Sequence, residues 1–572
     1  MVTLTIDNQQ VSVPEGTTIL KAAEELGIKI PTLCYLPKVN EIGACRVCVV
    51  QVEGEERMCA SCNTPVAEGM VVHTNTPQVV SARRLNLEMI LSEHNTECTS
   101  CERTETCALR RMADAFNVEK LPFEPKFAKR DWDEDFPLQR DASKCIKCMR
   151  CVAICSEVQH CSVWDFTGTG QHMKVTVKDG LPISEAKCAL CGQCITHCPT
   201  GALTARSDIN KVVDALADPN VVTVIQVAPA VRSAWGEGVG LTREEATQGR
   251  MAAAMRRLGF DYVFDTDFAA DLTIMEEGSE FLEYIKTDKK RPMFTSCCPG
   301  WVRFVKLHYP QFVGQLSSAK SPHEMMGACV KNTIAQDAKE EGKSIFCVSI
   351  MPCVAKKYEC SVPQLATEGG PDVDAVITTR EFDRMLRMFS VAVHDLPEEE
   401  FDAPLGMSTG AATIFGRTGG VMEAALRTAA FLLTGEVPDF ATCDCTDATP
   451  EKPWVVKELD IAGAHLAIAV ASGLENTAQL LDALDAGEVS YDFVEIMACP
   501  GGCVGGGGQP ISFNEELGPE RARVLNSLDG ADVLRFSHDN PQIKQFYADW
   551  AGEPLSHVSH KWLHTDQETW DI

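Results

Sequence analysis

The stretch DFVEIMACPGGCVGGGG, residues 492–508, runs from a short apolar segment into two cysteines and a run of glycines. The stretches RPMFTSCCPGW (291–301) and SIFCVSIMPCVAKKYE (344–359) have the same form, an apolar run followed by a cysteine loop. Such runs are typical of buried strands, and open α/β sheets build their sites where strands end. The three loops therefore predict one iron-sulfur site, not a set of disulfides, with four thiolate ligands: Cys298, Cys353, Cys499 and Cys503.

Length and cysteine content restrict the class of protein. A chain of 572 residues predicts several domains, at roughly 100 to 200 residues for each. The start, MVTLTIDNQQVSV, lacks the basic head and apolar stretch of an export signal. Most of the 27 cysteines stand in CxxC-type groups, and without such a signal they favour metal binding in a reducing cytoplasm. No apolar run approaches the ~18 residues needed to cross a bilayer, so no membrane partner is expected.

The acidic balance of the chain argues against nucleic acid as a partner. The formal net charge is -29 at pH 7. Phosphate backbones are bound by basic surfaces that release counterions, which a strongly acidic chain does not offer as a whole.

The predicted elements divide the chain into four parts of a multidomain α+β protein. Residues 1–78 alternate like the strands of a β-grasp 2Fe-2S ferredoxin domain around one helix, and residues 79–120 are helical with a second cysteine group. Residues 121–208 hold a connector and a two-cluster 4Fe-4S ferredoxin domain. Residues 209–572 alternate apolar strands with helices, which predicts a large α/β domain with a largely parallel sheet.

The first cysteine group has a spacing related to that of plant-type ferredoxins, whose thiolates hold a 2Fe-2S cluster. Its predicted ligands are Cys34, Cys45, Cys48 and Cys62. Cys59 lies just before Cys62 and is the alternative fourth ligand, and zinc is the alternative metal.

A second group combines one histidine with three cysteines: His94, Cys98, Cys101 and Cys107. On spacing alone, this group suits zinc nearly as well as an iron-sulfur cluster. The residues by themselves leave this choice open.

Two cysteine runs, KCIKCMRCVAIC (144–155) and KCALCGQCITHCP (187–199), repeat one another. Such a duplication is typical of two-cluster bacterial ferredoxins, in which the fourth cysteine of each run binds the other cluster. Ser156 stands where a proline would follow the first run, which removes no ligand. The expected ligand sets are Cys145, Cys148, Cys151 with Cys198, and Cys188, Cys191, Cys194 with Cys155.

The cysteine loops of the C-terminal half closely resemble the three signature motifs of the iron-only (FeFe) hydrogenases, and the order of the cysteine groups before them is similar as well. The resemblance implies an H-cluster domain over residues 209–572, with a C-terminal helical segment from about 530. Its centre would be a 4Fe-4S cube on the four loop cysteines, with Cys503 bridging to a two-iron unit that carries CO, CN and an azadithiolate. The resemblance also implies one 2Fe-2S cluster and three accessory 4Fe-4S clusters, one of them with His94 as a ligand.

The resemblance further assigns side chains around this centre. Lys356 matches a lysine that pairs with one cyanide. Ala230 stands where some members have a serine, and His323 stands where a glutamine is expected, two differences in the groups that tune such a centre. Apolar walls of the pocket are matched by Pro229, Met351, Phe415 and Met497.

A buried centre that exchanges protons needs a proton path. Cys297, next to a predicted ligand, matches the proton-donating cysteine of the family. Glu277 and Glu280 share a helical stripe with apolar residues, and partial burial would raise their pKa; without the resemblance, a solvated helix edge is the simpler interpretation. With it, the predicted path is Cys297, Glu277, Ser317 and Glu280.

The resemblance implies reversible reduction of protons to dihydrogen, with electrons from reduced ferredoxin or a similar carrier and with maturation proteins that insert the two-iron unit. One alternative is the catalytic subunit of an NAD(P)-linked or electron-bifurcating complex, which would need partner subunits because the chain has no convincing nucleotide-binding loop. Two further alternatives are a hydrogen sensor and a non-catalytic iron-sulfur protein. The cysteine pair of TSCCP disfavours the last of these.

Overall fold

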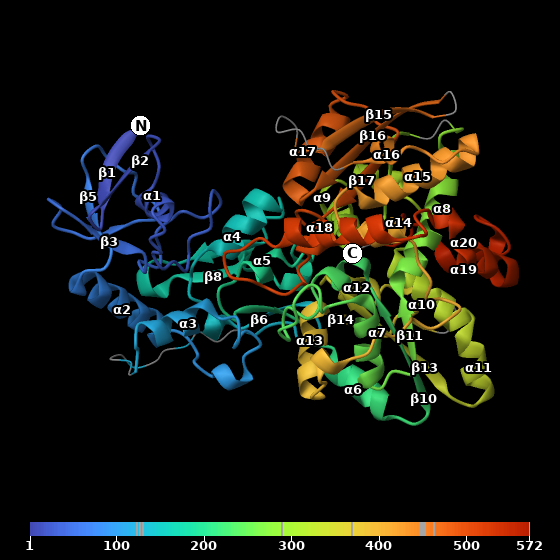
Figure 1. Ribbon diagram of the computed structural model, residues 1–572, viewed down its shortest axis with the longest axis horizontal. Coiled ribbons are helices and arrows are strands. Elements are labelled where there is room, and N and C mark those ends of the chain that lie inside the picture. Colours follow the sequence, from blue (N-terminus) through green and yellow to red (C-terminus); the bar gives the residue numbers. More distant parts are fainter. Residues whose placement is uncertain are drawn as a thin grey trace.

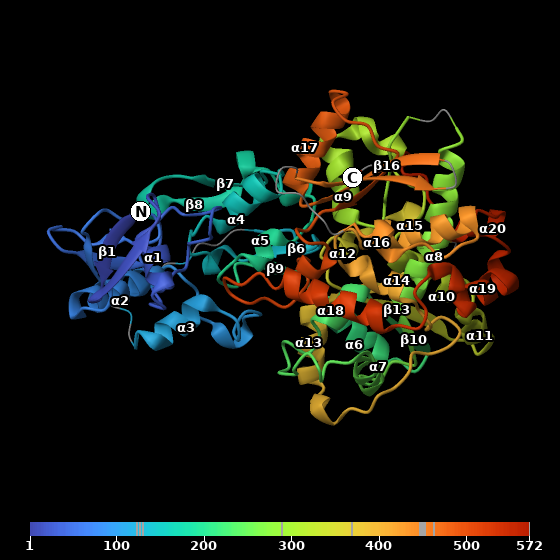
Figure 2. The ribbon, with the colours of Figure 1, turned by 45° about the horizontal axis from the view of Figure 1, so that its top comes forward.

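The computed structural model describes residues 1–119, 121, 124, 127, 131–287, 290–367, 370–445, 453–461, 464–570 and 572. The N-terminal parts extend from one side of a large C-terminal body (Figure 1). In both views the elements of residues 138–205 lie between the N-terminal sheet and that body (Figure 1, Figure 2). Most of the predicted connector between residues 120 and 130 lies outside the described residues.

The N-terminal sheet has five strands in the order β2-β1-β5-β3-β4. The predicted strands VTLTID and QQVSV are confirmed as an antiparallel pair, and helix α1 (Ile19–Glu25) begins after Thr18, whose side chain caps it. The alternating apolar residues meet in one core that includes Leu4, Ile19 and Val72. The strands are β1 (Val2–Ile6), β2 (Gln9–Val13), β3 (Val49–Val52), β4 (Cys59–Ala60) and β5 (Val71–His73).

The segment after this sheet is helical and leads into a pair of short hairpin-like sheets. Helices α2 (Pro77–Ser92) and α3 (Ala108–Ala115) flank the second cysteine group. The sequence repeat is also a structural repeat, because Met149 and Gly192, at equivalent positions, both take a left-handed conformation directly before a short helix. The elements of this part are β6 (Leu138–Arg140), α4 (Arg150–Ala153), β7 (Trp164–Thr167), β8 (Lys174–Val177), α5 (Gln193–Thr196) and β9 (Leu203–Ala205).

The large domain contains two four-stranded sheets. The first, in the order β11-β10-β13-β14, is parallel throughout, as predicted. The second, in the order β12-β17-β16-β15, departs from the prediction of a largely parallel sheet because β15 and β16 pair antiparallel. The strands are β10 (Val221–Val227), β11 (Tyr262–Asp265), β12 (Met293–Phe294), β13 (Ser344–Met351), β14 (Ala375–Thr378), β15 (Val455–Ile461), β16 (Ala464–Ser472) and β17 (Phe493–Met497).

That antiparallel pair has a simple cause: β16 begins three residues after β15 ends, whereas parallel neighbours need a crossover of about a dozen residues or more. Helix α8 (Thr266–Tyr284) contacts both sheets, since Phe268 packs with Val224 of β10 and Phe281 stacks on Phe493 of β17. This helix therefore reaches the centre of the domain.

The remaining helices cover the two sheets (Figure 1). They are α6 (Ile209–Ala217), α7 (Gln248–Arg257), α9 (Pro299–His308), α10 (Pro322–Asn332), α11 (Ile334–Glu340), α12 (Lys356–Glu359), α13 (Thr379–Met388), α14 (Gly410–Thr413), α15 (Gly420–Thr434), α16 (Phe440–Cys443) and α17 (Leu474–Asp485).

The C-terminal helical segment begins earlier than the predicted position of about 530. It comprises α18 (Gly518–Ala531), α19 (Pro541–Phe546) and α20 (His557–Leu563). Pro519 occupies the first turn of α18, where a missing N–H removes no helical hydrogen bond. Among the described residues, no helix is long and apolar enough to cross a bilayer.

Candidate active site

A cavity of about 80 Å³ lies where strands of both sheets of the large domain end. Strands β10, β13 and β17 deliver its walls, because each ends immediately before a lining residue. The structure brings together in this lining the predicted residues Pro229, Ala230, Cys297, Cys298, His323, Met351, Cys353, Lys356, Phe415, Met497 and Cys503.

Each of the four loop cysteines follows a strand end. Cys298 precedes α9, Cys353 lies two residues after β13, and Cys499 lies two residues after β17. Cys503 starts a single 3-10 turn that leads into the glycine run. Parallel strands of one layer present their carboxyl ends at the same edge, which is why loops far apart in the sequence meet here.

The four thiols lie close together, with Cys499 buried and Cys298, Cys353 and Cys503 partly buried. Burial is the main cause that raises the pKa of Cys353 to about 12, and the neighbouring Cys298 raises it further. The pKa of Cys499 is raised well above its ordinary value by burial and then by the other three thiols. Four thiolates so close together need a cationic group to hold their charge, which fits a metal cluster on Cys298, Cys353, Cys499 and Cys503.

The spacing of the cysteine groups distinguishes a cluster from a single ion. A tetrahedral zinc ion would bring its thiolates within about 3.8 Å of one another. In the described part of the chain, the only group of three or more possible ligands whose atoms all lie within 4.8 Å is His323, Glu324 and Glu359. In that group, the carboxylate of Glu359 already has a cationic partner, the Lys356 ammonium at 2.7 Å. The cysteine groups are thus wider than one zinc ion requires.

Lys356 is held at the cavity by a buried ion-pair network. Its Nζ donates to Glu359 Oε2 at 2.7 Å and to the carbonyl of Cys297 at 3.1 Å. Glu359 also contacts His323 Nε2 at 2.7 Å. Burial alone would raise the pKa of Glu359, but the charges of Lys356 and His323 lower it to about 2. His323 therefore holds Glu359 in place, and Glu359 in turn orients Lys356.

The predicted proton-path residues form a line from the cavity outward. Glu277 is 1% exposed, and burial, followed by the charge of Glu280, raises its pKa to about 8. Ser317 Oγ donates to Glu280 Oε2 at 2.7 Å. Burial and the charge of Glu277 raise the pKa of the Cys297 thiol well above its ordinary value. Glu277 thus lies on the buried side of α8 and not on a solvated edge.

Some residues of the site were missed by the sequence prediction. Thr266 lines the cavity and donates to Gln226 Oε1 at 2.8 Å, and Pro322 lines it at the start of α10. Ser318 binds Glu280 through both its N–H and its hydroxyl. No local motif marks these residues, because each is ordinary in its own segment.

The first cysteine group forms two hydrogen-bonded pairs of thiols. The bond between Cys34 and Cys45 is the main cause that lowers the pKa of Cys45 to about 6, and the bond between Cys48 and Cys62 is the main cause that lowers the pKa of Cys48 to about 7. Two thiol pairs match the needs of two irons, each with two protein ligands. Cys59 has no such thiol partner; burial is the main cause that raises its pKa.

His94 is buried beside the second cysteine group. Its Nδ1 lies 3.0 Å from the carbonyl of Lys144, which holds the ring and leaves Nε2 for another partner. Burial lowers the pKa of His94 and so favours the neutral imidazole that binds metal. Metal-bound histidines ordinarily donate their second N–H in this way.

The two cysteine runs of the repeat cross over in space, as predicted. One small cavity is lined by Cys145, Cys148 and Cys151 together with Cys198 from the other run. A second cavity is lined by the complementary set, Cys155, Cys188, Cys191 and Cys194. Cys161, to which the sequence assigned no role, also lines the second cavity.

The second of these cavities adjoins the loop cysteines of the large domain. Gln193 Nε2 donates to the carbonyl of Gly505 at 2.9 Å, and the Cys499 thiol lies 3.7 Å from the carbonyl of Cys191. Gly192 and Gly507 pack backbone to backbone, since a Cβ on Gly192 would lie 2.8 Å from the Cα of Gly507. The backbones of the two cysteine loops are therefore in direct contact at this point.

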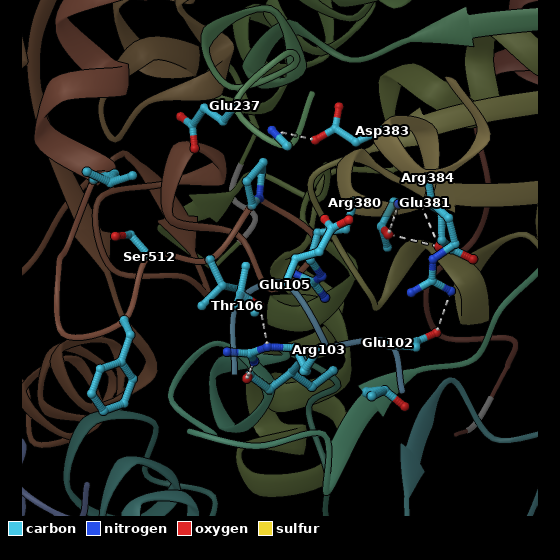
Figure 3. A pocket seen from close by; sticks show the side chains of 18 of the residues that line it. Glu102, Arg103, Glu105, Thr106, Glu237, Arg380, Glu381, Asp383, Arg384 and Ser512 are labelled. Atoms are coloured by element: carbon cyan, nitrogen blue, oxygen red, sulfur yellow. Dashed lines mark hydrogen bonds and ion pairs between the residues drawn. The ribbon is translucent and has the colours of Figure 1, made fainter. Parts of the chain in front are cut away.

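A larger cavity, of about 480 Å³, lies between the second cysteine group and helix α13 (Figure 3). Ion pairs cross it: Arg384 to Glu102 at 3.1 Å and Arg387 to Glu105 at 3.5 Å. It contains none of the predicted site residues. Its charged lining therefore joins the N-terminal parts to the large domain.

Family models match most of the chain in the predicted order. The model described as iron only hydrogenase large subunit, C-terminal domain, matches residues 221–507, and the iron hydrogenase small subunit matches 516–567. Residues 1–77 match a 2Fe-2S iron-sulfur cluster binding domain. Residues 83–122 match an NADH-ubiquinone oxidoreductase-G iron-sulfur binding region, and 137–204 match the ferredoxin-like domain of NADH-quinone oxidoreductase subunit 3.

Relatives match over the full length. The NADP-reducing hydrogenase subunit HndD of Solidesulfovibrio fructosivorans is 46% identical over 99% of this chain and 98% of its own. Iron hydrogenase 1 of Clostridium pasteurianum is 36% identical over 99% of both chains. The structure of apo FeFe-hydrogenase HydA1 from Chlamydomonas reinhardtii matches with a TM-score of 0.57 and 38% identity, over 63% of this chain and 98% of that one. The chain therefore belongs to the iron-only (FeFe) hydrogenase family and is an iron-sulfur oxidoreductase that acts on dihydrogen.

Proposed function

We propose that this hydrogenase reversibly reduces protons to dihydrogen at an H-cluster bound by Cys298, Cys353, Cys499 and Cys503. The observation that carries the proposal is the cavity of about 80 Å³ lined by Cys298, Cys353 and Cys503, with the Cys499 thiol close to all three. When bound, the two-iron unit supplies the metal chemistry that forms or splits dihydrogen. The protein's own residues position the unit, exclude water and move protons.

We assign the side of the cavity that is lined by Ala230, Met351, Lys356 and Met497 to binding the two-iron unit. Lys356, oriented by Glu359, would pair with a cyanide. Met351 and Met497 are buried and apolar, so they exclude water and strengthen the interaction between Lys356 and an anionic ligand. Ala230 offers no side-chain hydrogen bond here, and its carbonyl accepts from Ser233 Oγ at 2.8 Å and from Gln509 Nε2 at 2.9 Å.

Protons would move along Cys297, Glu277, Ser317 and Glu280. A carboxyl group whose pKa is about 8 is protonated near neutral pH yet can release its proton, as a relay requires. The hydrogen bond from Ser317 to Glu280 supports the outer step of this path.

Electrons would enter through one 2Fe-2S cluster and three accessory 4Fe-4S clusters, one with His94 as a ligand. The contact between Cys191 and Cys499 supports transfer from the last ferredoxin cluster into the H-cluster. Ferredoxin or a similar carrier would supply the electrons, and maturation proteins would insert the two-iron unit. For these roles we propose domains at residues 1–78, 79–120, 121–208 and 209–572.

A second candidate is the same chemistry within an NADP-linked complex. It is favoured by the 46% identity, over nearly the whole chain, to a subunit named NADP-reducing hydrogenase. Purification of the chain with its natural partners decides between the two: dihydrogen-dependent NADP reduction by a stable complex supports the second candidate, and ferredoxin-dependent turnover by the single chain supports the first.

The activity itself is tested anaerobically with iron-loaded protein to which the two-iron unit has been supplied. We expect dihydrogen evolution from reduced viologen, with infrared bands of bound CO and CN. Cys503→Ser should retain the accessory clusters and lose these bands. Bound CO and CN without any dihydrogen evolution would contradict the proposal and favour a sensor.

A further inference from the structure

The hydrogen bonds around Glu280 continue past the end of the predicted proton path. Ser318 donates to Glu280 Oε1 from its hydroxyl at 2.8 Å and from its backbone N–H at 3.0 Å. The same hydroxyl oxygen lies 2.8 Å from Nδ1 of His564. Glu280 is therefore linked through one hydroxyl group to an imidazole from the C-terminal segment.

The backbone fixes His564 in this place. Ala319 and His564 form an antiparallel bridge, with Lys320 N–H donating to the Leu563 carbonyl at 2.8 Å and Thr565 N–H donating to the Ser318 carbonyl at 2.8 Å. A short two-stranded contact thus holds the imidazole against Ser318. The side chain of His564 is 3% exposed, so the ring is packed and not a mobile surface group.

The second ring nitrogen has a partner of its own. Nε2 lies 3.0 Å from Glu276 Oε2, and Glu276 also accepts from the Tyr547 hydroxyl at 2.6 Å and from Leu555 N–H at 2.9 Å. Although burial opposes it, the hydrogen bonds from His564 and Tyr547 lower the pKa of Glu276. A carboxylate here holds the Nε2 proton and directs Nδ1 toward Ser318.

The outer face of His564 meets a solvent-exposed ring. The His560 ring stands one helical turn earlier on α20, with its centroid 4.6 Å from that of His564. His560 is exposed. The charged or titratable groups around His564 are therefore Glu276, Glu280, His560 and, through Glu276, Tyr547.

We propose that His564 is a relay residue that carries protons between the solvent side and Glu280 by way of Ser318. The inference rests on the proton path of the proposed function and extends it into the C-terminal segment. Imidazole is suited to this task because its two nitrogens can bind and release a proton at physiological pH.

The transfer conserves charge and involves no electrons. During proton reduction, the Nδ1–H bond of the protonated imidazole breaks and an O–H bond to Ser318 forms. The original hydroxyl proton of Ser318 passes to Glu280, so one positive charge leaves the ring and one carboxylate is neutralised. During dihydrogen oxidation the same bonds exchange in reverse.

The test uses full-length holoenzyme with His564→Gln, which keeps hydrogen-bonding capacity but cannot carry a proton. We expect dihydrogen evolution from saturating reduced viologen to fall by about tenfold or more. The infrared bands of CO and CN and the thermal midpoint should stay at parental values. His557→Gln, at an exposed histidine of the same helix, should keep the parental rate.

Rescue separates a relay from a structural role. In His564→Ala, added imidazole should raise the rate of dihydrogen evolution several-fold, because it can carry protons in the space of the missing ring. Loss of rate with altered infrared bands and no rescue would overturn the inference in favour of a structural role, and a parental rate in His564→Gln would also overturn it. Glu277→Gln separates the two proposals: a slow Glu277→Gln with a parental His564→Gln refutes the inference alone, whereas a parental Glu277→Gln refutes the proposed path itself.

Discussion

Glu277 has the clearest environment of any single residue in the site. It is a buried carboxyl group on an apolar face of α8. Among the described residues, neither of its oxygens has a partner at hydrogen-bonding distance and angle. A buried carboxyl group of this kind favours its neutral form. Its position between Cys297 and Glu280 turns that burial into a useful property for proton transfer.

The raised pKa of Glu277 predicts a dependence of stability on pH. The pKa rises from 4.5 to about 8, so the folded state binds this proton more tightly than the unfolded state does. The resulting stabilisation is complete below about pH 4.5 and is lost as pH rises through 8. We therefore expect the thermal midpoint of Glu277→Gln, measured as its difference from the parent, to rise as pH is raised from about 5.5 to about 8.5.

The matched control is Glu283→Gln, at an exposed carboxylate of the same helix. Its midpoint should differ from that of the parent by the same amount at both pH values. A constant difference for Glu277→Gln would show that its carboxyl group does not titrate with the raised pKa.

The ion-pair network behind Lys356 predicts a second effect at the scale of residues. Glu359→Gln leaves Lys356 and His323 as buried cations without their shared partner. We expect this substitution to lower the free energy of unfolding by about 3 kcal/mol, as is usual when one member of a buried pair is removed. Denaturant titration of the iron-loaded protein measures it.

The control is Glu520→Gln, which breaks the surface pair of Arg243 and Glu520. Surface pairs contribute about 0–1 kcal/mol, so its unfolding should stay close to that of the parent. Equal effects of the two substitutions would mean that the network around Lys356 is solvated.

Among the elements, the loops after β13 and β17 and the first turn of α5 form the junction between two cysteine groups. Gly192 has φ +72° and touches Gly507, whose own Cβ would lie 2.6 Å from the Cα of Gly192. Both positions thus exclude side chains for the same reason, a close approach of two backbones.

Gly192→Ala should destabilise this junction by more than the cost of a left-handed alanine, because the added Cβ also clashes with Gly507. A left-handed alanine costs about 1–2 kcal/mol, and the contact of 2.8 Å with Gly507 adds to that cost. We expect lower thermal stability and slower electron transfer into the H-cluster, measured as dihydrogen evolution from a protein electron donor.

Gly180→Ala is the matched control, because Gly180 has φ +71° and nothing within 4 Å of an added Cβ. It carries the backbone strain without the clash. If both variants lose the same stability and keep the same rate, then the close approach of Gly192 and Gly507 is not needed for the junction.

At the scale of the whole molecule, the N-terminal sheet, the elements of residues 138–205 and the large domain follow one another in space (Figure 1). The ion pair of Arg384 with Glu102 (Figure 3) and that of Arg387 with Glu105 fasten this arrangement beside the larger cavity. An electron that enters at the N-terminal end would pass every cysteine group before it reaches the catalytic cavity.

The pairing of thiols in the N-terminal domain tests this direction of transfer. Cys62→Ser should lose the electron paramagnetic resonance signal of a reduced 2Fe-2S cluster and lower turnover with ferredoxin, because Cys62 is the thiol partner of Cys48. Turnover with viologen, a small donor that can reach other clusters, should be affected less.

Cys59→Ser is the control and should keep both the signal and the rate with ferredoxin. The reverse result, loss of the cluster in Cys59→Ser and retention in Cys62→Ser, would make Cys59 the ligand and show the predicted choice to be wrong.

The sequence by itself determined the class of chemistry and the order of its parts. Cysteines two or three residues apart must lie on one loop, so local spacing is enough to predict where clusters can bind. The glycine and proline loops after apolar strands likewise identified the four thiols of the catalytic centre and the family. The strands of the N-terminal sheet and the parallel pairs of β10, β13 and β14 followed from apolar patterning.

Only the tertiary structure decided which distant groups touch. The contact of Gly192 with Gly507 and the bond between Ser318 and His564, 246 residues apart, have no local signal. Such contacts depend on how sheets and loops pack, and a residue's neighbours along the chain do not encode the register of a remote segment. Spacing therefore predicted the proposed metal ligands, whereas packing placed the charged residues and the proposed proton relay around them.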